Sequence, residues 1–378
     1  MKRIAFISIF IISLFPLQGI AQQKINGLVY NIVSKTHVEV ARNPSVEGNI
    51  IIPGSVIIKG KSYKVASIED YAFQYCNSLV SVTIPNSVTK IGSCAFSDCR
   101  YLTNIVIPNS VKSIGTSAFS GCRSLKEIVI PESLTTLEDY LFSDCHNLTN
   151  ITIPESVTSI GSSAFNFCDS LKNLVIPNSV TSIKDNAFLE CHSLVSISLP
   201  NSITSIGGFA FQNCKSLREV VIPCSVKSIM NSTFSDCSYL ASVTIPNSVK
   251  SIGSDAFSNC SSLKNLVIPD SLTVIESRAF YQCRSLTNVT IPSSTVSIKE
   301  SAFANCDSLT NMIIPNSIAS IGASAFENCH SLTSIAIPNS VKVIGVFAFG
   351  GCTTLKNVTL SNPHVVIESN AFPEGLVK

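Results

Sequence analysis

Cysteine and histidine are the residues of this chain whose types and spacing could support chemistry. Three of the five histidines, His146, His192 and His330, directly follow a cysteine. A thiol beside an imidazole can act as a nucleophile with its base, provided that both share a cleft with a third, orienting group. The equivalent position is Arg100 or Asp169 in other copies of a repeat described below. We therefore interpret it as a polar bend and predict no catalytic residue there.

Thirteen of the fifteen cysteines recur every 23 residues, from Cys76 to Cys352. So many cysteines in an exported chain could form disulfides. Pairing neighbours along an odd-numbered series would leave one thiol over and would make equivalent repeats unequal. We therefore predict buried free thiols, each acting as a small hydrophobe. Bridges between neighbouring repeats stay an alternative, because stacked positions fall within the permitted Cα separation of about 4.4–6.8 Å.

Cys94 and Cys224 lie outside this series. The spacing of Cys94 and Cys99 is not that of a metal-binding knuckle, and no histidine lies nearby in the sequence. Cys224 replaces an asparagine in a turn after Pro223, so we predict an exposed and reactive thiol. No carboxylate pair, phosphate-binding glycine loop or nucleophilic serine stands out from the repeat. We predict no catalytic, metal-binding or cofactor-binding residues, no cofactor and no enzymatic activity.

Phenylalanine shows the same period as cysteine and fixes the architecture. It recurs every 23 residues from Phe73 to Phe372, fourteen times. A period of this length predicts a solenoid, in which only the stacking of repeats buries their apolar side chains. The predicted buried ladder comprises Phe96, Phe119, Phe142, Phe165, Phe188, Phe211, Cys99, Cys122, Cys145, Cys168, Cys191 and Cys214.

One copy of the repeat, residues 102–124, indicates the elements that it forms. Leu102, Ile105 and Ile107 are apolar, and Pro108 ends the run because proline cannot donate to a sheet ladder. Stacked copies should place identical strands side by side at about 4.8 Å, in a parallel sheet. The following apolar residues are spaced by three to five positions, which predicts a compact turn with a short helical piece. Gly115 occupies a position that is glycine in only seven of fourteen repeats, so we interpret it as an exposed bend.

The pattern Leu-x-x-Ile-x-Ile with a return leg resembles the 23-residue bacterial leucine-rich repeat. Its continuation, Pro-x-Ser-Val-x-x-Ile-Gly-x-x-Ala-Phe-x-x-Cys, resembles the BspA-like family of surface proteins over residues 63–372. The resemblance implies an α/β repeat solenoid, shaped as a horseshoe or arc. A continuous parallel β-sheet would line the concave face, and short helical or 3-10 turns would form the return leg. It also implies adhesion to host extracellular-matrix proteins or to other microbial cell surfaces.

Composition and the N-terminal segment bear on the type of partner and on the location of the protein. Only 13% of residues are charged, against about 25% in ordinary domains, and the net charge is +2. Neither value favours nucleic acid as a partner. Lys2 and Arg3 precede an apolar run from Ile4 to Leu17, so residues 1–21 are predicted to be a signal peptide. The run is too short for a membrane span, which predicts an exported protein, secreted or at the cell surface.

The remaining chain is predicted to form two parts. Residues 22–64 should be an N-terminal β cap with a degenerate first repeat, and residues 65–378 should form thirteen to fourteen repeats. Solenoids need such caps because their end repeats would otherwise expose the core. The last predicted strand, residues 355–360, has no following repeat to pair with. That edge could support self-association.

Outward strand positions form the candidate binding surface. By analogy with leucine-rich repeats, two residues of each strand point outward on the concave face. They could be inert ladders that stabilise the sheet, or a broad, nearly neutral docking surface. We favour docking and predict a non-catalytic protein-binding or adhesion protein; the alternative is a self-associating surface-layer or scaffold component. The candidate surface comprises Asn150, Thr152, Asn173, Val175, Ser196, Ser198, Glu219, Val221, Ser242, Thr244, Asn265 and Val267.

Overall fold

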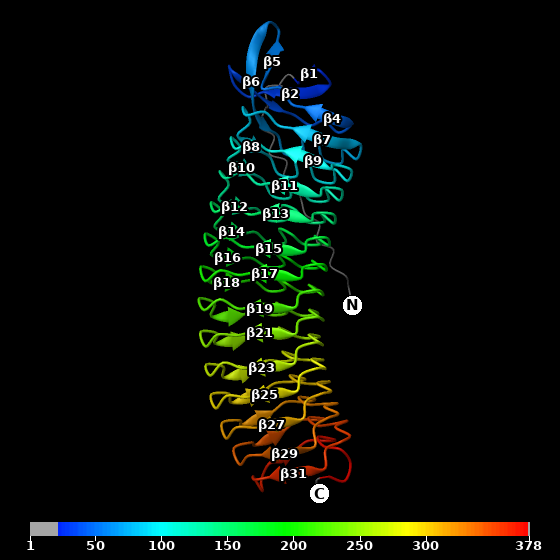
Figure 1. Cartoon of the computed structure of the whole chain (residues 1–378), viewed down its shortest axis with the longest axis vertical. Helices are drawn as coiled ribbons and strands as arrows, with labels where there is room; N and C mark the ends of the chain where they lie inside the picture. The colour runs from blue at the N-terminus through cyan, green and yellow to red at the C-terminus, as the bar shows by residue number, and fades with distance from the viewer. Residues whose placement is uncertain (1–21, 377–378) are drawn as a thin grey trace, which may run out of the picture.

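The computed structural model describes residues 22–376, which form an elongated column of stacked coils (Figure 1). Each coil advances the chain by one 23-residue repeat and contributes one strand to each of two rows. The first row consists of β7 (Leu79–Thr83), β9 (Asn104–Val106), β11 (Glu127–Val129), β13 (Asn150–Thr152), β15 (Asn173–Val175), β17 (Ser196–Ser198), β19 (Glu219–Val221), β21 (Ser242–Thr244), β23 (Asn265–Val267), β25 (Asn288–Thr290), β27 (Asn311–Ile313), β29 (Ser334–Ile337) and β31 (Asn357–Leu360).

A second row of two-residue strands lies on the return leg, at the Ser-Ile segment that follows the proline turn. Neighbouring strands pair in parallel wherever they are bonded. The second row consists of β8 (Lys90–Ile91), β10 (Ser113–Ile114), β12 (Thr136–Leu137), β14 (Ser159–Ile160), β16 (Ser182–Ile183), β18 (Ser205–Ile206), β20 (Ser228–Ile229), β22 (Ser251–Ile252), β24 (Val274–Ile275), β26 (Ser297–Ile298), β28 (Ser320–Ile321), β30 (Val343–Ile344) and β32 (Val366–Ile367).

Six N-terminal strands continue both rows at one end of the column (Figure 1). They are β1 (Gln23–Ile25), β2 (Leu28–Ile32), β3 (His37–Val40), β4 (Gly48–Ile51), β5 (Ser55–Ile58) and β6 (Lys61–Ile68). The first three strands pair antiparallel. β3 then pairs in parallel with β6, which leads into the second row at β8, while β4 pairs in parallel with β7 of the first row. The N-terminal strands, which pair both antiparallel and parallel, therefore cover the end of the first repeat.

The first row is a series of short ladders rather than the one continuous sheet that the sequence predicted. Its hydrogen-bonded groups are β4-β7-β9, β11-β13, β15-β17, β19-β21, β23-β25-β27 and β29-β31. Most of these strands have only three residues, so each pair is held by few ladder hydrogen bonds. A small increase in the spacing of two repeats is then enough to separate one ladder from the next.

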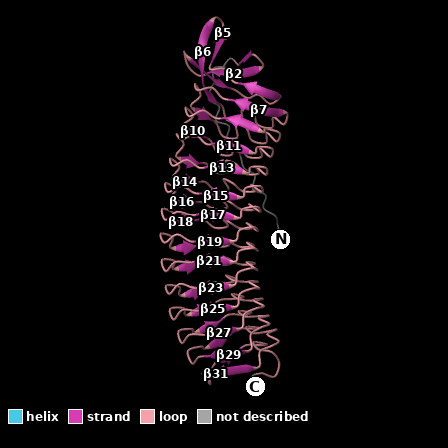
Figure 2. Cartoon of the chain, viewed as in Figure 1, coloured by secondary structure: helices cyan, strands magenta, loops and turns pink. Residues whose placement is uncertain are grey.

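The predicted helical or 3-10 return leg is wrong, since no helix occurs within the described residues (Figure 2). The N–H of Phe73 donates to the carbonyl of Ala95 in the next repeat at 2.7 Å, whereas the N–H of Gln74 closes a turn onto the carbonyl of Tyr71 at 3.2 Å. Alternate N–H groups therefore point along the column. A helix needs every N–H to bond within its own segment, and stacking removes half of them.

Residues in the left-handed backbone conformation produce this alternation of hydrogen-bond direction. Two positions per repeat, four residues apart, have a positive φ, such as Tyr71 at 62° and Tyr75 at 63°. These positions hold Tyr, Ser, Asn, Asp and even Phe209 in different repeats. Such residues adopt this conformation only at some energetic cost, which the inter-repeat bonds offset. The second of the two positions is Asn, Asp or Gly in nine of thirteen repeats, for example Asp98 and Asn213, and these residue types favour a positive φ. Residue type at the first position gives no such sign.

The recurrent glycine is not the exposed bend that the sequence suggested. Gly161 is buried and lacks a positive φ, and a Cβ built on it would lie 2.6 Å from the backbone N of Asp139 in the preceding repeat. Glycine therefore permits close backbone approach between two coils. Glu138 and Lys184 occupy this position in other repeats.

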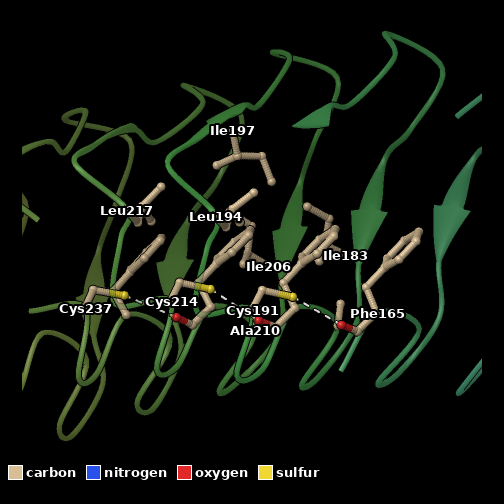
Figure 3. Close-up of a cluster of buried hydrophobic side chains, with 14 of the residues drawn as sticks. Phe165, Ile183, Cys191, Leu194, Ile197, Ile206, Ala210, Cys214, Leu217 and Cys237 are labelled. Atoms are coloured by element: carbon tan, nitrogen blue, oxygen red, sulfur yellow. Dashed lines mark hydrogen bonds between the residues drawn. The ribbon is translucent and has the colours of Figure 1, made fainter. Parts of the chain in front are cut away.

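The phenylalanines form one stack through the core (Figure 3). All six predicted ladder phenylalanines are buried. Ring centroids of successive repeats lie between 5.0 and 5.8 Å apart, and the rings are nearly parallel. Offset stacking at such distances is favourable for aromatic rings beyond the area that they bury. The stack runs from Phe73 to Phe372 and joins all the repeats.

The ladder cysteines are buried beside this stack, and all fifteen cysteines are free thiols. The ladder thiols from Cys99 to Cys352 each donate a hydrogen bond to the phenylalanine carbonyl of the preceding repeat, as Cys191 does to Phe165 at 3.1 Å (Figure 3), whereas Cys76 donates to the carbonyl of Asn43. The carbonyl of Phe165 also accepts the N–H of Cys168. Cysteine thus fills a small apolar space and also supplies a weak donor for the second lone pair of a buried carbonyl.

Candidate functional site

The outward side chains of the first row form a surface that we call the strand face. Period-two alternation in each strand turns residues such as Leu174 and Leu266 into the core, where they are 3% exposed, and turns their neighbours to solvent. All twelve residues of the candidate binding surface are exposed. The structure therefore places them together along the middle of the column.

Shallow grooves follow the strand face. One of about 540 Å³ runs across β9, β11 and β13, with Val106, Val129 and Thr152 among its lining residues. Another of about 350 Å³ crosses β15, β17 and β19 and includes Val175 and Val221. Both are open hollows that cross several repeats, a shape suited to an extended partner rather than to a small enclosed substrate.

Exposed aliphatic side chains are unevenly distributed on the strand face. Val129, Val175 and Val267 are 79%, 72% and 74% exposed. The intervening repeats carry Thr152 and Ser198 at the same strand position. Apolar and hydroxyl side chains therefore alternate from one repeat to the next. Neighbouring polar side chains also bond to each other, as Ser196 does to Asn173 at 2.8 Å.

Four basic residues beside this surface were not predicted, because the sequence analysis considered only positions within the strands. Lys126, Lys172, Arg218 and Lys264 immediately precede their strands, and all four are exposed. Within residues 22–376 none of them forms an ion pair. Their 46-residue spacing, twice the repeat length, is a signal in the sequence that could have identified them.

The Cys-His dipeptides do not form a catalytic pair. His146 and His192 both contact the carboxylate of Asp169, each through Nδ1 at 2.8 Å, and His192 also contacts Glu190 at 2.8 Å. These side chains lie partly exposed on the turn leg, by which we mean the segment between the second-row strand of one repeat and the first-row strand of the next. The Cys145 thiol, by contrast, is buried and donates to a core carbonyl. His146, Asp169 and His192 therefore join three successive repeats at the surface.

The other predicted chemical groups are placed as follows. The Cys224 thiol is exposed and lies 3.4 Å from Oδ1 of Asn201. Among residues 22–376 no three His, Cys, Asp or Glu side chains are grouped so that they could hold a metal ion. No helix in that part of the chain is long and apolar enough to cross a membrane. The predicted signal peptide, residues 1–21, lies outside the described residues.

Comparison with known proteins gives a consistent result. The sequence matches the family described as the BspA type leucine rich repeat region (6 copies) over residues 66–191, 158–287 and 273–375. A search of curated proteins found no match. A leucine-rich repeat protein from Bacteroides ovatus is similar in structure, with 31% identity, coverage of 92% of this chain and 90% of that one, and a TM-score of 0.71.

Two further solved structures share this architecture. A leucine rich cell surface protein from Faecalibacterium prausnitzii is 31% identical, covers 92% of this chain and 98% of its own, and has a TM-score of 0.60. The pneumococcal vaccine antigen PcpA is 20% identical over 94% of this chain and 91% of its own, with a TM-score of 0.56. The likeness to PcpA concerns the fold alone.

Proposed function

Because the chain belongs to the BspA-type leucine-rich repeat family, we propose that it is an exported, non-catalytic binding protein. Its role is adhesion, through docking of other proteins on the strand face. Residues 1–21 act as the signal peptide in this proposal, residues 22–64 as the N-terminal cap, and the repeats as the binding part. Similarity to a leucine rich cell surface protein from Faecalibacterium prausnitzii supports a place at the cell surface or in the medium.

One observation carries this proposal: a long row of exposed aliphatic and small polar side chains that no other part of the described chain covers. Val129 and Val267 are 79% and 74% exposed, and the residues between them continue the row. Extended surfaces of this kind are what solenoids use for binding. The partners that fit the family resemblance are host extracellular-matrix proteins and the surfaces of other microbial cells.

The test is a binding assay in which the strand face carries new charges. Val175→Lys and Val267→Lys place a bulky cation on outward strand positions, while the inward neighbours stay unchanged. Binding of wild type and variants to immobilised extracellular-matrix proteins and to intact microbial cells is then measured. Loss of a central contact should weaken binding by about 2 kcal/mol or more, which is roughly thirtyfold in Kd.

Matched controls carry the same charge on the second row. Ser205 and Ser251 are exposed there, so Ser205→Lys and Ser251→Lys change charge without adding to the strand face. Circular dichroism verifies that all four variants are folded. Equal affinities of strand-face variants and controls would show that the partner does not bind at the strand face.

Self-association, as in a surface layer or scaffold, is the second candidate function. β31 pairs with β29 on one side, and the described residues that follow supply no strand for its other side. Val366 and Ile367 of β32 are 56% and 37% exposed near this edge. Light scattering across a concentration series tests it: a mass that rises with concentration supports self-association, and a constant monomer mass excludes it.

A further inference from the structure

The seven residues before each ladder cysteine form the first part of the turn leg, as residues 69–75 and 138–144 do. We call these segments the bends, and the surface that the thirteen stacked bends form the bend face. The bends contain thirteen Asp and Glu residues but only three basic residues, although the whole chain has a net charge of +2. Negative charge is therefore concentrated on the bend face. The basic residues are Lys184, Arg278 and Lys299.

Large exposed side chains occur on the bend face at the third position of every third bend. Tyr71, Tyr140, Phe209 and Phe347 are 46%, 48%, 40% and 43% exposed there, and Arg278 completes the series. The eight other bends have Cys, Ser, Asn or Asp at this position, with the same left-handed backbone. Because these smaller residues fit the same backbone, the fold does not require an aromatic ring at this position. The exposed rings are therefore available to a partner.

A carboxylate precedes two of these rings in the sequence and is held in place by a backbone N–H. Oδ1 of Asp70, the residue before Tyr71, accepts the N–H of Ser93 in the next repeat at 2.8 Å. Asp139 is held in the same way before Tyr140, also at 2.8 Å. A carboxylate has two acceptor oxygens, so each can accept further hydrogen bonds. An aromatic ring with a carboxylate beside it is an arrangement that attracts cations.

Arg278 shows how the bend face holds a cation. Its Nε donates to Oδ1 of Asp255 in the preceding bend at 2.8 Å, and its guanidinium carbon lies 4.2 Å from the centre of the Tyr281 ring. Lys184 also contacts a bend carboxylate, that of Asp139, at 3.3 Å. Two of the chain's own basic side chains therefore lie on bend carboxylates, and one of them lies over a ring as well.

The first bend combines two exposed rings with carboxylates that repel one another. Tyr71 and Tyr75 are 46% and 56% exposed. Burial and the neighbouring carboxylates of Glu39 and Asp70 raise the pKa of Glu69. Within residues 22–376 no Lys or Arg forms an ion pair with Glu69 or Asp70. A cation bound here would relieve this repulsion, so charge complementarity favours a basic partner.

The contacts of Arg278 favour arginine as the basic group of that partner. A guanidinium is planar, so it can stack on an aromatic ring and donate to a carboxylate at the same time. Phosphate and sulfate groups would meet like charge on the bend face, which disfavours nucleic acid and sulfated glycans. The complementary partner is consequently a polypeptide segment rich in basic residues.

We propose that the bend face binds an arginine-rich segment of another protein. Its guanidinium groups stack on the exposed rings of Tyr71, Tyr75 and Tyr140 and donate to the carboxylates of Asp70 and Asp139. The bends and the strand face are different parts of each repeat. This second binding surface therefore goes beyond the proposed function and does not depend on it.

The probe is a fluorescent peptide made of four copies of Gly-Arg-Ser, titrated against the whole exported chain. Salt is kept at about 0.15 M, where attraction between distant exposed charges is screened. The matched peptide has citrulline, which is uncharged and nearly the same shape, in place of each arginine. We expect the arginine peptide to bind at least about tenfold more tightly. Equal binding of the two peptides would overturn the proposal.

Ring variants separate stacking from simple charge attraction. Tyr71→Ser with Tyr140→Ser leaves the net charge unchanged and should weaken binding of the arginine peptide about fivefold or more. Serine occupies the same position in other bends, for example Ser117 and Ser163, so the fold accepts the change. Tyr239→Ser, at a tyrosine that is 65% exposed outside the bends, is the control and should leave binding unchanged. Equal affinities of the double variant and the control would overturn the proposal.

Charge variants locate the carboxylates that bind. Asp70→Asn with Asp139→Asn should weaken binding about fivefold or more. Asparagine keeps the hydrogen bond to the next repeat, as Asn231 does with the N–H of Ser254 at 3.1 Å, and circular dichroism verifies the fold.

Glu132→Gln with Asp270→Asn is the matched control, because it removes two exposed carboxylates from the proline turns and should leave binding unchanged. Equal effects of the two pairs of carboxylate variants would overturn the proposal. Tighter binding of a chitosan oligomer than of the arginine peptide would also overturn it and would identify an amino-sugar polymer as the occupant. Neither result bears on the strand face, which the valine variants test separately.

Discussion

The ladder cysteine has two functions in the core, and both depend on its staying protonated. Cys122, Cys168 and Cys214 are fully buried, and burial raises their pKa well above the ordinary range. A thiol is a hydrogen-bond donor, whereas a thiolate is not, and each ladder thiol donates to a backbone carbonyl. The same burial that makes cysteine useful in the core therefore makes it chemically inert.

Thiol labelling tests this interpretation residue by residue. In the native protein Cys224, the exposed cysteine, should react with a maleimide first, followed slowly by the half-buried Cys94. After denaturation without a reductant, all fifteen cysteines should react, as counted by mass spectrometry. Most thiols remaining blocked in the denatured, unreduced protein would show that they are paired and would contradict the prediction.

Burial of the thiols also predicts instability at alkaline pH. Burial raises the pKa of Cys283 from 9.0 to about 12. Well below pH 9 both folded and unfolded chains keep the proton, so the full stability is present. As the pH rises from 9 towards 12, the unfolded chain loses protons that the folded chain holds. The free energy of unfolding then falls by about 1.4 kcal/mol per pH unit for each such thiol.

Urea denaturation at pH 8, 9 and 10 measures this effect. The transition midpoint should fall between pH 8 and 9, as the unfolded thiols begin to ionise, and fall further between pH 9 and 10. Cys283→Ala removes one buried thiol and should reduce the pH dependence, although it also lowers stability at pH 8. A midpoint that does not change between pH 8 and 10 would contradict the assigned burial of the thiols.

At the scale of the element, one repeat is a coil with two short strands and a turn leg, and none of these is stable alone. The strands have two or three residues, and the turn leg sends alternate N–H groups to the next coil. The phenylalanine side chain holds the coils together, since Phe188 stacks between Phe165 and Phe211 with both centroid distances at 5.3 Å. Each repeat is therefore defined by its neighbours.

Phe188→Ala is expected to reduce the free energy of unfolding by about 3–5 kcal/mol, because it opens a cavity in a fully buried site. Chemical denaturation followed by circular dichroism measures the loss. Phe209→Ala, at an exposed position on the turn leg, is the matched control and should change stability far less. Similar losses for the two variants would contradict the core position of the phenylalanine stack.

At the scale of the whole molecule, the column is linear, and each repeat contacts mainly its neighbours. Hydrogen bonds and ring stacking connect residues about one repeat apart along the chain, for example the Cys352 thiol and the Phe326 carbonyl. In such a molecule the stability is close to a sum of repeat and interface terms. Damage in one repeat should therefore spread only a short distance.

Hydrogen exchange in Phe188→Ala tests this locality. Amides in residues 165–211 should exchange faster than in wild type, while those in residues 303–349 should keep their protection, because distant repeats share no contacts with the altered site. Unfolding can then divide into two transitions. A uniform increase in exchange along the whole column, with one transition, would indicate that the solenoid unfolds as a single cooperative unit.

The sequence alone determined the solenoid, its 23-residue period, the buried phenylalanines and cysteines, and the outward strand positions. These features follow from the alternation and recurrence of apolar residues, which depend on nothing beyond the local chain. Tertiary structure decided the return leg, the interrupted ladders and the role of the recurrent glycine. Spacing of Val111, Ile114 and Phe119 is compatible with a helix, but hydrogen bonds to the next repeat take the N–H groups that a helix requires. Such competition between neighbouring coils is absent from any single repeat, and only the stacked column settles it.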